Sequence, residues 1–174
     1  VILYENDVHC AVDGYAKLAS MKRALATAYD HVGVVSSGDF VQGGTLGAVS
    51  KGEYIINLMN KVGYDAIALG NHEFDYQLAR LVELNNLSNT KFLSCNFAKV
   101  GEDKSYFDSY TIVSYGDVEI AYIGITTPDT ISSSNPAQFK NENGEIIYTF
   151  NEAEMYNLVQ ANIDAVLKAG ADYV

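Results

Sequence analysis

The chain contains few of the residues that characterise several protein classes. It has 174 residues, with only two cysteines, two prolines and three histidines, and 11 Lys+Arg against 22 Asp+Glu. The cysteines, Cys10 and Cys95, are far apart in sequence, which excludes a disulfide-rich framework. A net charge of −11 opposes binding to nucleic acid or to anionic membranes, so we expect neither as a partner.

Long apolar runs and targeting signals are also missing. No stretch is long enough to span a bilayer, and residues 1–4 resemble a strand and not the basic start of a signal peptide. The chain has no initiator Met and stops inside an expected strand, so we expect a mature or cut chain. No GxGxxG or P-loop follows an expected strand, which argues against a Rossmann-type nucleotide-binding domain.

Segments with strand and helix patterns alternate along the chain. The expected strands are 1–4, 32–36, 66–69, 91–94 and 171–174, with a hairpin of 106–115 and 118–125, and the expected helices are 15–29, 53–62, 76–85 and 151–168. This alternation predicts an α/β fold with βαβ units and a mostly parallel sheet. Gly116-Asp117 is the turn signal of the hairpin, and residues 132–145 are expected to form a surface loop.

Polar side chains follow the first three expected strands. Asp7 and His9 come after the first strand, Asp39 after the second, and Asn71 with His72 after the third. Parallel strands place such turns side by side, at the edge of the sheet where α/β proteins bind ligands. We therefore expect these side chains to converge.

The residue types at these strand ends suit divalent metal ions. In an extended segment Asp7 and His9 would point the same way and could bind one ion. Asp39 could bridge two ions, and Asn71 offers a carbonyl oxygen to the second. Oxygen and imidazole ligands suit Zn, Mn, Fe or similar ions, and in so acidic a chain a metal would supply the positive centre that a phosphate group needs.

His72 and Asp75 form a second candidate pair. At positions i and i+3 near a helix start they can touch, and a carboxylate fixes the imidazole tautomer and favours the protonated ring. A positioned imidazolium can stabilise charge on a phosphoryl oxygen or protonate a leaving alkoxide.

Each of these features also has a purely structural interpretation. Gly38-Asp39 is an ordinary turn pair, Asn71 could cap the helix that follows, and Glu73 or Asp75 could complement its dipole. Cys10 is interpreted as a small buried hydrophobe. Their succession at three consecutive strand ends favours a shared site.

Three runs resemble the first three motifs of the calcineurin-like metallophosphoesterases: NDVH at 6–9, GDFVQG at 38–43 and GNHEFD at 70–75. Gln42-Gly43, Phe74-Asp75 and residues 124–130 are similar to the branch of 5′-nucleotidases and 2′,3′-cyclic-nucleotide 2′-phosphodiesterases, which is usually exported. The resemblance implies a metallophosphoesterase-like α-β-β-α layered sandwich, here truncated, and an extracellular, periplasmic or cell-surface location.

The resemblance also implies a role for each matching residue. Asp7 and His9 would hold the first of two divalent ions (Zn, Mn, Fe, Co or similar), Asp39 would bridge both, and Asn71 would hold the second. His72 would act on the phosphoryl group of a nucleotide ester, oriented by Asp75.

The chain departs from the family where the later metal ligands should be. In the family, the remaining ligands are a His after the next core strand and the histidines of a Gly-His-x-His motif. His31 matches neither of them. We therefore expect residues 1–174 to be the N-terminal portion of a catalytic domain, without the C-terminal nucleoside-binding domain and separated from the other half of its parent chain. Alone it should bind at most one ion well and be inactive or weakly active.

Two other functions stay open on the sequence alone. A non-catalytic binding or scaffold domain could keep the fold and lose the metals. A phosphodiesterase of another substrate class, such as a nucleotide-sugar hydrolase, could use the same chemistry.

Overall fold

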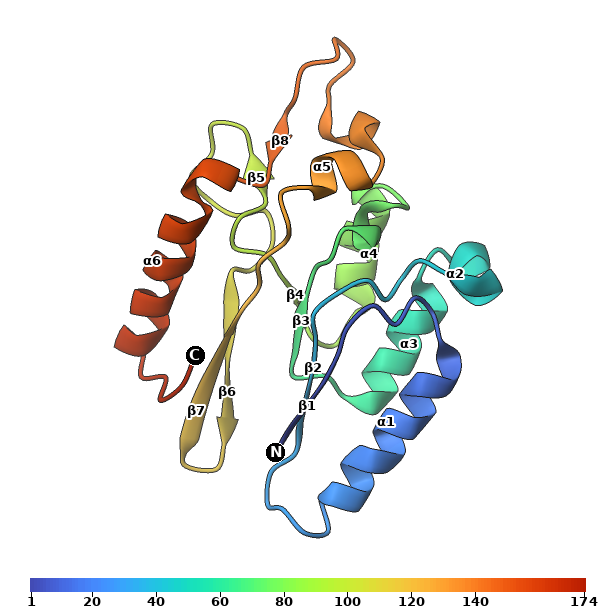
Figure 1. Ribbon diagram of the computed structural model, residues 1–174, viewed down its shortest axis with the longest axis vertical. Coiled ribbons are helices and arrows are strands. Elements are labelled where there is room, and N and C mark those ends of the chain that lie inside the picture. Colours follow the sequence, from blue (N-terminus) through green and yellow to red (C-terminus); the bar gives the residue numbers. More distant parts are fainter. The chain divides into compact units, whose positions relative to one another are not determined.

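The computed structural model describes residues 1–174, which form two compact units (Figure 1). The first unit comprises Val1–Ile67 and His72–Lys91, and the second comprises Ala68–Asn71 and Phe92–Val174. The predicted site residues therefore belong to both units, with Asn71 in the second and the others in the first. No helix has the length and apolar character needed to cross a bilayer.

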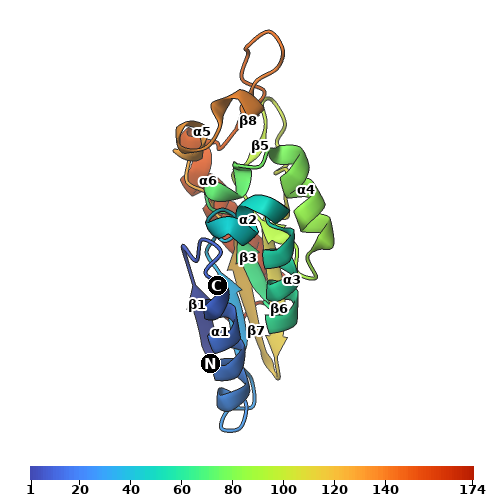
Figure 2. The ribbon, with the colours of Figure 1, turned by 90° about the vertical axis from the view of Figure 1, so that its right-hand side faces the viewer.

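The first unit combines parallel strands with helices. Its elements are β1 (Ile2–Glu5), α1 (Val12–Leu25), β2 (Gly33–Ser36), α2 (Gly44–Ser50), α3 (Glu53–Val62), the first two residues of β3 (Ala66–Ala68), the 3-10 turn η1 (His72–Phe74) and α4 (Leu78–Leu87). β1 pairs in parallel with β2, and β2 pairs in parallel with β3. Figures 1 and 2 show α1 and α3 along one face of β1 and β2, and the two helices pack against each other.

The apolar residues of the first unit explain this arrangement. α3 buries Ile55, Ile56, Met59 and Val62, which recur at helical spacing and so form one apolar stripe. Val34 of β2 is fully buried, as expected for a parallel strand with neighbours on both edges. The core also contains Phe40, Val41, Ile67, Phe74, Leu81 and Leu84.

The second unit contains the antiparallel strands. Its elements are β4 (Phe92–Leu93), β5 (Ala98–Lys99), β6 (Tyr110–Tyr115), β7 (Val118–Ile123), α5 (Thr130–Ser133), η2 (Pro136–Phe139), β8 (Tyr148–Thr149), η3 (Glu152–Glu154) and α6 (Met155–Lys168). The order β1-β2-β3-β4 defines the main sheet, and Leu69, just after β3, donates its N–H to the Leu93 carbonyl. β6 and β7 form a hairpin, and β5 pairs antiparallel with β8.

Two apolar groups stabilise the second unit. Val166 of α6 packs with Ala121 of β7 and with Ala171. Around Phe97, aromatic rings lie with centroids 4.9 to 6.2 Å apart, at distances where offset and edge contacts are favourable. These rings belong to Tyr106, Phe107, Phe139, Tyr148 and Phe150.

The predicted α/β class, with a mainly parallel sheet and a β-hairpin, is confirmed. The loop expected at 132–145 is wrong in part, because it includes the end of α5 and all of η2, where Phe139 is fully buried. The strand expected at 171–174 is reduced to one bridge between Tyr173 and Ile120. α2 was not expected, because its glycines and serine hide its helical pattern.

We predict that Asn96→Ala destabilises the second unit by about 3 kcal/mol, because it leaves buried polar groups without partners. The Asn96 amide is fully buried, donates to the carbonyls of Thr126 and Phe150 at 2.7 and 2.9 Å, and accepts the Thr126 N–H at 2.9 Å. Urea unfolding measures the change, with exposed Asn157→Ala as the control. Equal stability of the two variants would contradict this role for Asn96.

Candidate metal centre

The turns after β1 and β2 are joined by backbone hydrogen bonds. The N–H of Asp7 donates to the Gly38 carbonyl at 3.2 Å, and the N–H of His9 donates to the Asp39 carbonyl at 2.9 Å. Because β1 and β2 pair in parallel up to Glu5 and Ser36, both turns leave the same edge of the sheet. The expected convergence of these strand ends is therefore present in the first unit.

The backbone between β1 and α1 is not extended, and this corrects our reason for pairing Asp7 with His9. Asp7, His9 and Cys10 have φ values of 55°, 45° and 61°, in the left-handed region that non-glycine residues seldom adopt. The two side chains still converge, because the chain coils tightly here and is held by its bonds to the next turn. The two side chains lie close together as predicted, but the extended conformation predicted for them is wrong, and their role as ligands of one ion stays a prediction.

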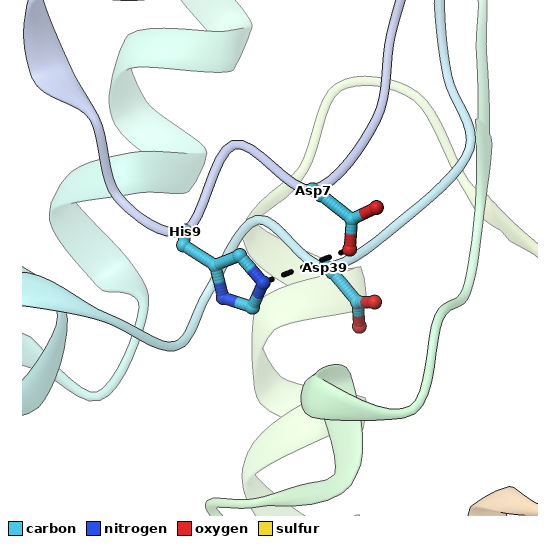
Figure 3. A group of neighbouring side chains, drawn as sticks. All are labelled: Asp7, His9 and Asp39. Atoms are coloured by element: carbon cyan, nitrogen blue, oxygen red, sulfur yellow. Dashed lines mark ion pairs between the residues drawn. The ribbon is translucent and has the colours of Figure 1, made fainter.

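Asp7, His9 and Asp39 bring together a set of possible metal-ligand atoms (Figure 3). One oxygen of each carboxylate and one nitrogen of His9 lie within 4.8 Å of one another. His9 Nε2 is 3.6 Å from Asp7 Oδ1. Two carboxylates and an imidazole are ligands that Zn and similar divalent ions accept.

Gln42 and Gly43 explain how His9 is oriented. His9 Nδ1 lies 3.2 Å from both the backbone carbonyl and the side-chain Oε1 of Gln42, so Nδ1–H is the donor. Nε2 is then left with its lone pair toward Asp7, the tautomer that a metal needs. Gly43 has φ 119°, and a Cβ at that position would overlap the His9 carbonyl.

The charge on Asp39 is poorly compensated by the protein. Burial raises the pKa of Asp39, the N–H of His72 opposes that shift, and the nearby Asp7 carboxylate adds to it. A carboxylate whose pKa is raised by burial and by a neighbouring carboxylate fits a bound cation, which would reverse this shift. The donor set and its electrostatics therefore both suit a divalent ion.

His72 lies beside this group and contacts Asp75 as predicted. Its Nδ1–H donates to Asp75 Oδ2 at 2.7 Å, and its ring centroid is 5.0 Å from that of His9. Burial lowers the pKa of His72, but the hydrogen bond and charge of Asp75, with the charges of Asp39 and Glu73, raise it by more. The net shift favours the imidazolium, as expected from the sequence.

Two residues that contact the candidate site were not predicted from the sequence to do so. Glu73, considered there only for a helix dipole, is 1% exposed and accepts backbone N–H groups of the Asp39 turn. Gln42 was noted for its resemblance alone. Neither residue could be recognised from the sequence, because a side chain that orients another residue has no fixed sequence distance from it.

The other predicted residues have separate outcomes. Asn71 is half-buried at the turn before η1 and belongs to the second unit, so its role as ligand to a second ion stays a prediction. Cys10 is buried as expected, and its thiol donates toward the Val41 carbonyl at 3.2 Å. Burial raises the pKa of Cys10 to about 11, which favours the neutral thiol of a buried packing residue.

Comparison with known proteins identifies the family. The sequence profile of the calcineurin-like phosphoesterases matches residues 1–169. The chain belongs to this family, and the resemblance read from its motifs is confirmed.

Similar proteins include several named 5′-nucleotidases. A snake venom 5′-nucleotidase of Gloydius brevicauda is 34% identical over 83% of this chain and 28% of its own length. A 5′-nucleotidase of Bos taurus is 31% identical over 97% of this chain and 33% of its own length. The chain therefore spans about a third or less of these curated relatives. A calcineurin-like phosphoesterase of Bacillus subtilis has the same fold, with a TM-score of 0.80 at 22% identity over 98% of this chain and 59% of its own.

We predict that Asp75→Asn lowers the pKa of His72, because burial then acts against a weaker opposing interaction. NMR titration of the His72 ring protons in metal-free protein measures the change, with the exposed His31 as the internal reference. An unchanged or raised pKa of His72 in the variant would contradict the pairing.

Proposed function

We propose that the parent protein hydrolyses phosphate esters of nucleotides with divalent metal ions, and that this chain supplies the first part of its active site. The observation that carries the proposal is the convergence of Asp7, His9 and Asp39 beside His72, in a chain of the calcineurin-like phosphoesterase family. Nucleotidase names among the similar proteins support the substrate class.

Asp7 and His9 would hold the first ion, Asp39 would be shared by both ions, and Asn71 would contribute to the second. When bound, two such ions supply Lewis-acid charge that polarises a phosphoryl oxygen and activates water. The protein would keep His9 in the tautomer that leaves Nε2 free, through Gln42.

His72 would act directly on the substrate. Its Nδ1 is occupied by Asp75, so Nε2–H of the imidazolium is the group available to the phosphoryl oxygen or the leaving alkoxide. The raised pKa of His72 keeps this proton in place over a wider pH range. Asp75 is the residue that orients the ring.

The substrate branch extends the proposal beyond this chain. 5′-Nucleotidase and 2′,3′-cyclic phosphodiesterase activities are both compatible with the proposed site, and the choice would depend on a nucleoside-binding domain elsewhere in the parent. By likeness to a venom enzyme, we propose an extracellular, periplasmic or cell-surface location for the parent. The C-terminal half of the parent chain would be the main partner of residues 1–174.

We predict that His72→Ala in the full-length parent reduces kcat for a nucleoside 5′-monophosphate about 100-fold or more while bound metal is retained, since His72 is not a metal ligand. Phosphate release and metal analysis are measured on the same samples, with His31→Ala as the matched control. Full activity of the His72→Ala parent would contradict the catalytic role. A metal-free wild-type parent would instead favour the scaffold alternative.

We predict that the isolated 174-residue chain has little or no nucleotidase activity with added Mn²⁺ or Zn²⁺, because the second ion would have only Asp39 and Asn71 as ligands. Equilibrium dialysis should find at most one tightly bound ion per chain. Turnover close to that of the full-length parent would show that the ligand set is sufficient and would overturn this prediction.

A further inference from the structure

Glu73 is a buried carboxylate to which the proposed reaction assigns no role. It follows His72 in η1 and is 1% exposed. An ionised carboxylate at such a position is costly unless hydrogen-bond donors surround it. The donors therefore indicate what the residue does.

The donors are three successive backbone N–H groups in the turn after β2. The Asp39 N–H donates to Glu73 Oε2 at 2.7 Å, and the Phe40 and Val41 N–H groups donate to Oε1 at 2.8 and 3.3 Å. Consecutive N–H groups that point to one place form a concave anion site. Here the anion is a side chain of the same protein.

This turn has a backbone conformation that needs support. Gly38 and Asp39 have φ values of 106° and 59°, and the left-handed region is less favourable for Asp39 than for a glycine. The three bonds to Glu73 hold the N–H groups of this turn in one direction. The direction of the Asp39 side chain depends on that backbone.

The Asp39 side chain is held from the same segment. The His72 N–H donates to Asp39 Oδ1 at 2.8 Å. Two adjacent residues thus hold Asp39 at both ends, because Glu73 accepts from its backbone while His72 donates to its carboxylate. The hydrogen bond from the His72 N–H involves Oδ1 of Asp39 and not Oδ2.

We infer that Glu73 is a positioning residue of the metal centre, which sets the turn after β2 so that Asp39 faces Asp7, His9 and His72 before any ion binds. In this role Glu73 would act through the backbone of the Asp39 turn and not as a metal ligand. The inference rests on the metal site of the proposed function. It adds the residue on which the affinity of that site depends.

The test is Co²⁺ binding by the whole 174-residue chain, measured by calorimetry. In Glu73→Gln, the single amide oxygen can still accept from Phe40 and Val41, but the NH₂ group faces the Asp39 N–H. We expect Co²⁺ affinity to fall about 10-fold or more, the usual effect of losing a group that orients a ligand. Far-UV circular dichroism confirms that the variant is folded.

Three further variants sharpen the comparison. Glu73→Asp keeps the charge on a shorter side chain, so its affinity should lie between those of wild type and Glu73→Gln. Exposed Glu152→Gln makes the same chemical change in η3 and should bind as wild type does. Asp39→Ala removes a ligand and should abolish binding.

The outcomes separate this inference from the proposed function. If the wild-type chain binds no Co²⁺, the proposed metal site is wrong. If wild type binds and a folded Glu73→Gln binds equally well, only the role of Glu73 is wrong.

A measurement on wild type covers the case in which Glu73→Gln does not fold. Hydrogen exchange in metal-free protein should show slow exchange at the amides of Asp39 and Phe40, since Glu73 holds them without an ion. Rapid exchange of these amides, slowed only by Co²⁺, would mean that the ion orders the turn, and it would overturn the inference.

Discussion

The closeness of two negative charges is the constraint on which the rest of this site depends. Asp7 and Asp39 lie on separate turns, yet each offers an oxygen within 4.8 Å of the other and of His9. Burial and mutual repulsion raise the pKa of Asp39, so the protein alone does not favour this arrangement. Backbone bonds between the two turns enforce it, and a divalent ion would make it favourable.

Three side chains of the candidate site, those of His9, Asp39 and His72, each have a partner that fixes their direction. Gln42 leaves Nε2 of His9 free, Asp75 occupies Nδ1 of His72, and the backbone N–H of His72 binds the carboxylate of Asp39. Such partners reduce the entropy lost when an ion or a phosphate group binds, because the side chains are already ordered. They also explain why the motifs extend beyond the candidate ligands, to the positions of Gln42 and Asp75.

Much of this could be predicted from the sequence because it follows from regular patterns. Alternating strand and helix patterns predicted the parallel sheet, and polar residues at three strand ends predicted the convergence of Asp7, His9 and Asp39. The spacing of three residues between His72 and Asp75 predicted their contact. These features depend on local periodicity and on the common direction of parallel strands.

What was missed depends on contacts that no local pattern encodes. The left-handed backbone at Asp7 and His9 is imposed by bonds to Gly38 and Asp39, residues about 30 positions away. Glu73 looks like a surface charge in the sequence, because its burial follows from the N–H groups of a distant turn. Phe139 was assigned to a loop, because its aromatic neighbours Phe97 and Phe150 are remote in sequence.

The most direct test of the metal centre is anomalous diffraction from crystals of the chain soaked with Mn²⁺. The account predicts an anomalous peak from one Mn²⁺ ion, which is coordinated by carboxylate oxygens of Asp7 and Asp39 and by Nε2 of His9. A well-ordered site without a peak, or a Mn²⁺ ion bound only by other residues, would contradict it.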